Sequence, residues 1–370
     1  MTESKVRTLR VAHISTFPPQ RCGIAEYVAD LVDALEGVES LNFGLMKRPP
    51  VPEGCKASVD VTNRVNLRAL ARAVRDAGAD IIDLQHEFGI WGGDEGEHIL
   101  AFLEACDLPI VSTLHTTFPP GINQKQSIIL KALLRASTRA IVLTELAGEN
   151  IRLLDPESSP KLRVIRHGVP VVDFVHPPSG SVSFVSPGFF RPDKGLEIVL
   201  TALSMLADEG HKFHHTVVGG IQLDNGDQRR YYAQMEILTR KLGISDKVAV
   251  IAEDLERDAL AKRIADADCA VLGYSNVLQA SSGIIPLVLS SGRWVVCPPI
   301  EYVRATIEEV PGLIATEGLG SLQLFDTLKA FVLEIDSRRH AAQRIYHETR
   351  SWGWGETAKR YRGVFDEALG

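Results

Sequence analysis

Cysteine is scarce in this chain of 370 residues, and its few copies are scattered. They are Cys22, Cys55, Cys106, Cys269 and Cys297. Their number is odd and no pair has CxxC spacing, so the sequence predicts neither a disulfide framework nor a zinc site. Such usage is typical of a reducing, intracellular compartment.

The sequence also lacks a long hydrophobic run. No apolar stretch reaches the ~18 residues that a membrane-spanning helix needs. Residues 1–5 lead directly into charged side chains and lack the apolar core of a signal peptide. No Lys/Arg-rich amphipathic helix argues for association with a membrane, and peripheral membrane contact is left open. We therefore expect a cytoplasmic protein.

An excess of positive charge is missing as well, because 40 Lys and Arg face 47 Asp and Glu and leave a formal charge of −7. This balance excludes a broad basic surface for nucleic acid, although it is compatible with a local basic pocket. With 45% apolar and 24% charged residues, the composition is that of an ordinary globular protein. The length predicts about two domains.

Apolar, strand-like runs alternate with helix-length segments along most of the chain. In the first half the expected strands are 9–15, 81–84, 109–114, 140–143 and 163–165, and a helix is expected from about Ile24. In the second half they are 184–187, 215–219, 248–251, 269–272 and 294–297. Short apolar strands that alternate with helices predict an α/β fold with parallel sheets.

The alternation breaks near mid-chain, where Pro177 and Pro178 stand among small polar residues. Such a stretch is typical of a linker between domains. We therefore expect a first Rossmann-like domain at 1–172, a linker at 173–182, a second Rossmann-like domain at 183–350 and a C-terminal helix at 351–370. In such folds ligands bind beyond the carboxyl ends of the strands, where loops meet helices.

Two loops of the first domain carry residues suited to ligand binding. Gly23 follows the first strand and opens a helix, where free amides can meet a ligand; a simple turn is the alternative. After the strand at 81–84 come His86, Glu87, Trp91 and Gly92. Trp91 would offer a flat face to a sugar ring. His86 and Glu87 would bind hydroxyls, unless His86 caps the strand and Glu87 is solvated.

Two histidines stand just beyond later strands of the same domain. His115 follows the strand at 109–114, and His167 follows the strand at 163–165. Most isolated histidines are structural. These two are expected to point into a cleft between the domains, because each follows the carboxyl end of a strand.

A pair of cations follows the first strand of the second domain. The segment 186–195 contains Gly188, Arg191 and Lys194 before a helix that is expected from about Gly195. Two cations beside free helix amides predict a diphosphate site. The segment is not a Walker loop, because the GxxxxGK[ST] pattern is absent. The alternative is a solvated surface pair.

Another loop of the second domain, 274–285, leads into an apolar helix. It contains Gln279, Ser281, Ser282, Gly283 and Ile284. Its amides and hydroxyls would suit sugar hydroxyls and phosphate, or would form a helix cap alone.

Patterns that would ligate a metal are weak. The segment 266–268 has the DxD spacing of metal-dependent sugar transferases, but it precedes a strand instead of following one. His211, His214 and His215 have no companion Cys or Asp. We therefore expect no metal site.

Together these segments resemble a retaining glycosyltransferase of the GT-B fold, in glycosyltransferase family 4. The loop from Pro18 to Gly23 is similar to the family's glycine loop, with Cys22 where many members have a second glycine. The segment 84–93 is similar to the Gln-His-Glu-Phe-Gly-Ile-Phe-Gly-Gly segment of one bacterial subgroup, with Trp91 in the Phe position.

The resemblance extends over nearly the whole chain. His115 is similar to the family histidine that approaches the donor sugar. Lys194-Gly195 resembles the family's Lys-Gly pair, which holds the diphosphate. Ser351-Trp352 and the tail that follows resemble the terminal segment that crosses back to the first domain.

The resemblance implies two Rossmann-like domains with the active site in the cleft between them. It implies transfer of a hexosyl group from a nucleoside-diphosphate sugar to a hydroxyl acceptor, with retention and without a metal or other cofactor. GDP-mannose is the favoured donor and UDP-glucose the next. The acceptor would be a glycan, a small molecule or a lipid-linked sugar, as in polysaccharide biosynthesis.

The resemblance also assigns roles to residues. His115, Lys194 and Arg191 would be catalytic, with the two cations on the leaving diphosphate. The donor would bind near Gly188 and the loop from Gln279 to Ile284. The acceptor would face Gly23, His86, Glu87, Trp91 and Gly92, and His167 would line the cleft.

Two features depart from the family pattern. Members usually carry two glutamates around the helix of the 274–285 region, and Gln279 and Leu287 stand there instead. The arginine that usually follows the glycine of the Lys-Gly loop is Phe189, and Arg191 would substitute for it. These departures leave open a GT-B protein that binds sugars or nucleotides without transfer, as a partner subunit. A sugar-nucleotide epimerase is a third reading, although its acid and base carboxylates cannot be assigned.

Overall fold

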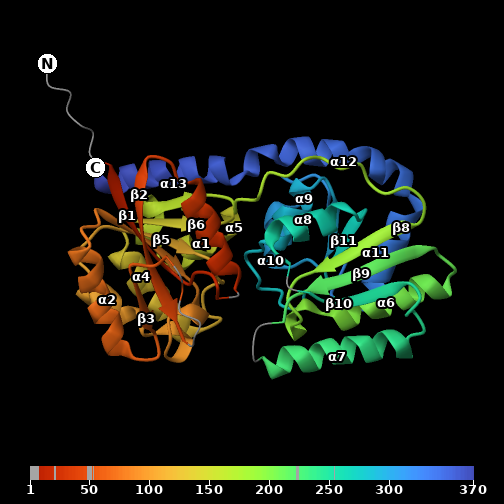
Figure 1. The fold of residues 1–370 in the computed structure, drawn as a ribbon, viewed down its shortest axis with the longest axis horizontal. Helices are drawn as coiled ribbons and strands as arrows, with labels where there is room; N and C mark the ends of the chain where they lie inside the picture. The colour runs from red at the N-terminus through yellow and green to blue at the C-terminus, as the bar shows by residue number, and fades with distance from the viewer. Residues whose placement is uncertain (1–7, 21, 48–51, 53, 222–224, 254) are drawn as a thin grey trace, which may run out of the picture. The chain divides into compact units, whose positions relative to one another are not determined.

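The computed structural model describes residues 8–20, 22–47, 52, 54–221, 225–253 and 255–370. The chain divides into two compact units (Figure 1). The first contains Met1–Gly168 and Trp354–Gly370, and the second contains Val169–Gly353. Arg21, which lies in the loop before Gly23, is outside the described residues.

The first unit is built on a parallel, seven-stranded sheet with the order β3-β2-β1-β4-β5-β6-β7. Its strands are β1 (Leu9–Ser15), β2 (Val38–Met46), β3 (Ala57–Asp60), β4 (Ile81–His86), β5 (Ile110–Leu114), β6 (Arg139–Val142) and β7 (Leu162–Val164). Every residue of the central strands β4 and β5 is buried. Helices must therefore cover both faces of this sheet.

The helices of the first unit begin where side chains can cap them. They are α1 (Gly23–Ala34), α2 (Arg64–Asp76), α3 (Ile99–Ala105), α4 (Gln124–Ala136), α5 (Glu145–Leu154) and α13 (Trp354–Leu369), with short 3₁₀ turns at Phe88–Ile90, Asp94–Gly96 and Pro156–Lys161. Asn63, Asn123 and Thr144 precede α2, α4 and α5, and each side chain accepts a hydrogen bond from a first-turn amide. Such caps satisfy amides that have no partner within the helix.

The last helix of the chain belongs to the first unit. In α13, Trp354, Tyr361 and Phe365 are buried in a cluster with Tyr27 of α1 and Val111 of β5. The Tyr361 hydroxyl lies 2.7 Å from that of Tyr27 and 2.9 Å from Thr113 Oγ1. The chain therefore leaves this unit after residue 168 and returns at residue 354 to complete its core.

The second unit is built on a parallel, six-stranded sheet with the order β10-β9-β8-β11-β12-β13. Its strands are β8 (Val182–Pro187), β9 (Phe213–Gly219), β10 (Val248–Ala252), β11 (Cys269–Val271), β12 (Trp294–Cys297) and β13 (Leu313–Ala315). Its helices are α6 (Leu196–Asp208), α7 (Gly226–Lys241), α8 (Arg257–Ala265), α9 (Ile284–Ser290), α10 (Glu301–Thr306), α11 (Ser321–Leu333) and α12 (Ile335–Thr349), with 3₁₀ turns at Pro192–Lys194 and Arg350–Trp352. Two apolar clusters pack against this sheet.

The predicted α/β class and every predicted strand are confirmed, each strand within two residues of its expected ends. The strands β2, β3 and β13 were not expected from the sequence. The segment predicted as a linker, 173–182, is bonded within the second unit. Within this segment the Val175 carbonyl accepts from the fully buried Arg293 at 2.7 Å, and just before it the Val172 carbonyl accepts from Tyr346 at 2.9 Å.

One buried histidine of the second unit has no role in the sequence-predicted site. His215 lies on β9 in the interior, and neither ring nitrogen has a hydrogen-bond partner among the described residues. Burial lowers its pKa to about 3. The neighbouring His214 on the same strand is exposed.

We expect His215→Leu to make the second unit less sensitive to acid. The folded state holds this ring neutral down to a pKa of about 3, whereas the unfolded chain protonates it near 6.5. Between these values the unfolded state binds more protons, so stability falls as the pH drops below ~6.5. Urea unfolding at several pH values should show the slope of unfolding free energy against pH reduced by about 1.4 kcal/mol per pH unit.

The matched control is His214→Leu, because this ring is exposed in the folded state. Its slope should equal that of the unmodified chain. Equal slopes in both variants would contradict the account of His215.

Candidate functional site

The two histidines predicted beside β5 and β7 come together in the first unit. The Tyr27 ring of α1 packs edge-to-face against His115 and against His167, with centroid distances of 4.8 Å in both cases. Burial lowers the pKa of His115 to about 3 and that of His167 to about 4. Both rings are therefore neutral near pH 7.

The tautomer of His167 follows from its partner. Its Nδ1 lies 2.6 Å from the carbonyl oxygen of Gly168. A carbonyl can only accept, so Nδ1 carries the proton and Nε2 is the acceptor of the neutral ring. Gly168 must remain a glycine here, because a Cβ would lie 2.3 Å from the Trp354 ring. The same residues thus pack α13 and orient His167.

His86 ends β4 beside His115. Its backbone carbonyl accepts from the His115 amide at 3.0 Å. Its ring is fully buried edge-on to Phe88 at 4.8 Å, and neither ring nitrogen has a hydrogen-bond partner among the described residues. Burial lowers the pKa of this ring to about 3. The ring thus forms no strand-capping bond within the described chain.

Glu87 connects the loops that follow β4 and β5. One carboxylate oxygen accepts from the Gly89 amide at 3.3 Å, and the other accepts from the Thr116 hydroxyl. The alternative of a fully solvated carboxylate is therefore wrong. Glu87 fixes the loop in which the candidate acceptor residues lie.

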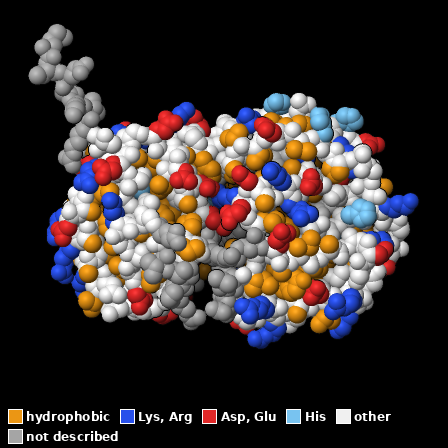
Figure 2. Space-filling model, viewed as in Figure 1, with side chains coloured by type: hydrophobic (Ala, Val, Ile, Leu, Met, Phe, Trp, Pro, Cys, Tyr) orange, Lys and Arg blue, Asp and Glu red, His pale blue; other side chains and the backbone are white. Residues whose placement is uncertain are grey.

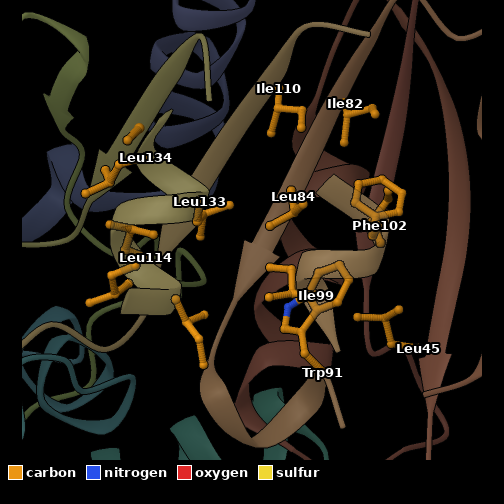
Figure 3. Close-up of a cluster of buried hydrophobic side chains, with 14 of the residues drawn as sticks. Leu45, Ile82, Leu84, Trp91, Ile99, Phe102, Ile110, Leu114, Leu133 and Leu134 are labelled. Carbon is orange, nitrogen blue, oxygen red and sulfur yellow. The ribbon is translucent and has the colours of Figure 1, made fainter. Parts of the chain in front are cut away.

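The prediction that Trp91 offers its face to a sugar is wrong. The indole is fully buried in the apolar core among Leu45, Ile99 and Phe102 (Figure 3). Its Nε1–H donates to the Gln85 carbonyl at 3.1 Å, so the polar end is satisfied inside the protein. Burial of so large an apolar ring favours the core over solvent.

Two glycines near these side chains differ in how tightly the chain surrounds them. Gly92 has φ +74°, and a Cβ there would lie 2.1 Å from the Val61 carbonyl oxygen, so the turn requires glycine. Gly23 opens α1, and no described atom lies within 4 Å of the place of its Cβ. The loop before it borders a cavity of about 340 Å³. This cavity is lined by Phe17, Pro18, Pro19, Ala29, Val32, Asp33 and Asn42.

In the second unit, the cations after β8 share one carboxylate. Arg191 Nε donates to Asp193 Oδ1 at 2.8 Å, and Lys194 Nζ lies 3.6 Å from Asp193 Oδ2. The Lys194 side chain is only 20% exposed and its Nζ lies 4.6 Å from the centre of the Tyr274 ring, whereas Arg191 is 51% exposed. Burial lowers the pKa of Lys194. An anion beside Nζ would offset that cost.

The backbone around Lys194 packs against neighbouring backbone so closely that only glycine fits at two positions. Gly195 has φ +57° and caps α6, and a Cβ there would lie 1.9 Å from the Gly273 carbonyl oxygen. A Cβ on Gly219 would lie 1.6 Å from the carbonyl oxygen of Gly188, which is predicted to bind the nucleotide-sugar donor. Strand ends and loops of this unit therefore approach each other through glycines.

The loop before α9 is held by its own polar groups. Gln279 Nε2 donates to the Ser281 carbonyl at 2.9 Å, and Ser282 Oγ accepts from the Ile285 amide at 3.2 Å. Gly283 and Ile284 then start the helix, as expected. Leu287 lies in the apolar core of this unit, so its side chain packs inward.

Sequence reasoning missed several residues beside these loops. The Tyr274 ring packs against Lys194 Nζ. Glu301 has a buried side chain, and its backbone amide donates to the Val277 carbonyl at 2.8 Å. In the first unit it missed Asp83 and Gln85, which are buried on β4. Polar residues at alternate positions of an apolar strand were the available signal, because buried polar groups require partners.

Charge and metal patterns are unremarkable over the described residues. Cationic and acidic side chains are interspersed on the face that Figure 2 shows. No group of three His, Cys, Asp or Glu residues in the described part of the chain is arranged to hold a metal ion. Within the same residues, no helix has the length and apolarity needed to cross a bilayer.

Comparison with known proteins identifies the fold. No family model and no curated protein matches the chain. Sucrose-phosphate synthase from Thermosynechococcus elongatus shares 15% identity over 97% of this chain and 98% of its own, with a TM-score of 0.79. HepE from Anabaena in complex with UDP-glucose shares 11% identity over 96% of this chain and 99% of its own, with a TM-score of 0.74.

A third similar structure is the UDP-forming α,α-trehalose-phosphate synthase from Burkholderia xenovorans in complex with glucose-6-phosphate. It shares 12% identity over 98% of this chain and all of its own, with a TM-score of 0.71. The chain has the GT-B fold. Identities this low establish the GT-B fold alone, so membership of family 4 and the roles of its motifs stay predictions.

We expect Gly195→Ala to destabilise the second unit by about 2–4 kcal/mol, because the left-handed backbone and the Gly273 carbonyl both oppose a Cβ. Gly226→Ala is the control, since no described atom lies within 4 Å of the place of its Cβ and its φ is not positive. It should change stability by less than about 0.5 kcal/mol. Urea unfolding followed by far-UV circular dichroism measures both. Similar stability of the two variants would contradict the packing described for this turn.

Proposed function

We propose that this protein is a retaining glycosyltransferase that moves a hexosyl group from a nucleoside-diphosphate sugar to a hydroxyl acceptor. The observation that carries the proposal is Lys194. It is a largely buried cation at the carboxyl end of β8, directly before α6, on a GT-B fold. A largely buried ammonium is costly unless an anion compensates for it.

The similar structures support a nucleotide sugar as donor. HepE is in complex with UDP-glucose, and the trehalose-phosphate synthase is described as UDP-forming. We propose mannosyl transfer from GDP-mannose first, on the resemblance of the 84–93 segment, and glucosyl transfer from a UDP donor next. The acceptor would be a glycan, a small molecule or a lipid-linked sugar, with peripheral membrane contact in the last case.

The chemistry asks for stabilisation of charge on the departing diphosphate as the glycosidic bond breaks. We assign that task to Lys194 and to Arg191, which would exchange its bond to Asp193 for a phosphate oxygen. Ser282 and the amides around Gly283 would contribute hydrogen bonds to the donor. No role is assigned to a metal ion.

The first unit would supply the polar contacts to sugar hydroxyls. We assign orientation of the donor sugar to His115, which is neutral at the pH of the reaction because its pKa is about 3. Gly23 and Glu87 would face the acceptor, and His167 would add a neutral ring beside them. The fully buried His86 ring and the Gly92 turn would shape this loop from within. Trp91 supports these residues from the core.

Incubation with GDP-mannose, UDP-glucose and other nucleotide sugars, with candidate acceptors, tests the proposal. Release of nucleoside diphosphate that depends on the acceptor, and a product with the donor's anomeric configuration by NMR, would support it. A second candidate is a GT-B subunit that binds without transfer, which the core position of Leu287 and the presence of Phe189 favour. Tight donor binding without release under any pairing would favour this second function.

We expect Lys194→Ala to lower kcat by about 100-fold with a smaller change in KM, because the cation acts mainly as charge develops on the leaving group. Lys212→Ala removes an exposed cation of the same unit and should leave kcat unchanged. Steady-state assays with the active donor measure both. An unchanged kcat in Lys194→Ala would refute the role of this lysine.

We expect Gln279→Ala to lower kcat/KM by roughly 5- to 30-fold, the value of one or two kcal/mol of transition-state binding. Gln343→Ala, at an exposed position on α12, is the control. Leu287→Glu should restore little, since that side chain points into the core. If Gln279→Ala matched the unmodified enzyme while Leu287→Glu raised activity about tenfold, the assignment of this loop to the donor would be wrong.

A further inference from the structure

A line of polar side chains, buried except for the half-buried Ser40 at its start, runs through the first sheet and ends at His115. Its members are Ser40 on β2, His13 on β1, Asp83 and Gln85 on β4, and His115 after β5. His13 Nε2 lies 3.2 Å from Ser40 Oγ, and His13 Nδ1 lies 2.8 Å from Asp83 Oδ2. Gln85 Nε2 lies 2.8 Å from Asp83 Oδ1, and Gln85 Oε1 lies 2.8 Å from His115 Nε2.

The direction of these bonds follows from the carboxylate. Asp83 accepts at both oxygens, from the His13 ring and from the Gln85 amide, because a carboxylate has no proton to donate. The NH₂ group of Gln85 must therefore face Asp83, which turns its carbonyl oxygen toward His115. That oxygen can only accept, so His115 Nε2 must carry a proton.

We propose that Asp83 and Gln85 are positioning residues that hold His115 as the Nε2–H tautomer, with Nδ1 as the acceptor of the neutral ring. His13 supports Asp83 from the far side. The inference rests on the proposed function only for its consequence in catalysis. The tautomer itself follows from contacts within the first unit.

Burial makes a purely space-filling role for these side chains expensive. The side chains of His13, Asp83 and Gln85 are completely inaccessible to solvent. They lie on the central strands β1 and β4, whose other buried side chains belong to apolar clusters. Buried polar groups cost free energy unless every one is paired, and apolar residues would fill the same volume without that cost. The pairing here is complete along the line and ends on the histidine that the proposed function uses.

The tautomer restricts what His115 can recognise. A neutral ring that offers Nδ1 as acceptor pairs with a group that donates, such as a sugar hydroxyl or an amine. It does not pair with an unprotonated phosphate oxygen, which also only accepts. Within the proposed function, a ligand group that meets Nδ1 would therefore be a hydroxyl or an amine.

The test is nitrogen NMR of the full chain with ¹⁵N-labelled histidine at about pH 7, where ring couplings identify the protonated nitrogen. The His115 signals are assigned by their loss in His115→Asn. We expect the proton on Nε2 and a lone pair on Nδ1. A proton on Nδ1, with Nε2 bare, would overturn the proposal without any variant.

Two variants of Gln85 separate positioning from packing. Gln85→Glu should keep the Nε2 proton, because a protonated carboxyl group would donate its O–H to the Asp83 carboxylate and accept from His115 with its other oxygen. Gln85→Met keeps the volume but removes both bonds, so the single tautomer should give way to a mixture or to an exchange-broadened Nε2 proton. Ser112→Ala is the control, since it removes a buried hydroxyl from the neighbouring strand β5, outside the line.

Activity provides a second, separate readout. With an active donor, Gln85→Met should lose about tenfold in kcat/KM, roughly the value of one hydrogen bond, and Gln85→Glu should retain most activity. An Nε2 proton that persists undisturbed in Gln85→Met would overturn the positioning role even if transfer is found. If the spectra agree with the expectation but no donor is turned over, the tautomer stands and the proposed transferase function fails.

Discussion

The packing of α13 against α1 and β5 determines how the chain is divided. A parallel sheet must be covered on both faces, and in the first unit one face is covered in part by Trp354, Tyr361 and Phe365. The hydroxyl of Tyr361 lies within hydrogen-bond distance of Tyr27 and of Thr113. The helix α13 is therefore bonded to α1 and β5, which precede it by more than 200 residues in the sequence. The second unit is consequently an insertion within the first.

The two units carry different electrostatic environments. The candidate histidines of the first unit are neutral rings, since burial keeps His86, His115 and His167 unprotonated. Those of the second unit are cations, Arg191 and Lys194, which share the carboxylate of Asp193. Neutral acceptors suit hydroxyls and cations suit phosphates, which is the division of labour that transfer from a nucleotide sugar requires.

Much of the fold could be predicted from the sequence because central parallel strands are apolar on both faces. Strands such as β11 and β12 therefore appear as unbroken apolar runs. The strand β2 was missed because Glu39, Ser40 and Asn42 interrupt its apolar residues. The edge strands β3 and β13 have only four and three residues, so their apolar residues form no run long enough to mark a strand.

The candidate site was predictable only in part. Lys194 and His115 could be found because charged and polar residues directly after a strand fall at the carboxyl edge of the sheet. Trp91 could not be placed, since the choice between core and surface depends on α3, whose position the local sequence does not fix. The line through Asp83 and Gln85 was missed because it joins strands that are far apart in the sequence.

The order of the chain has a consequence for folding during synthesis. Residues 169–353 form a continuous segment that contains every element of the second unit, so this unit can close as soon as its last helix emerges. The first unit begins earlier and finishes later, because its core lacks Trp354 and Tyr361 until the second unit has been synthesised. Until then the apolar surface of α1 and β5 lacks the cover of α13, and transiently exposed apolar surface of this kind is prone to aggregation.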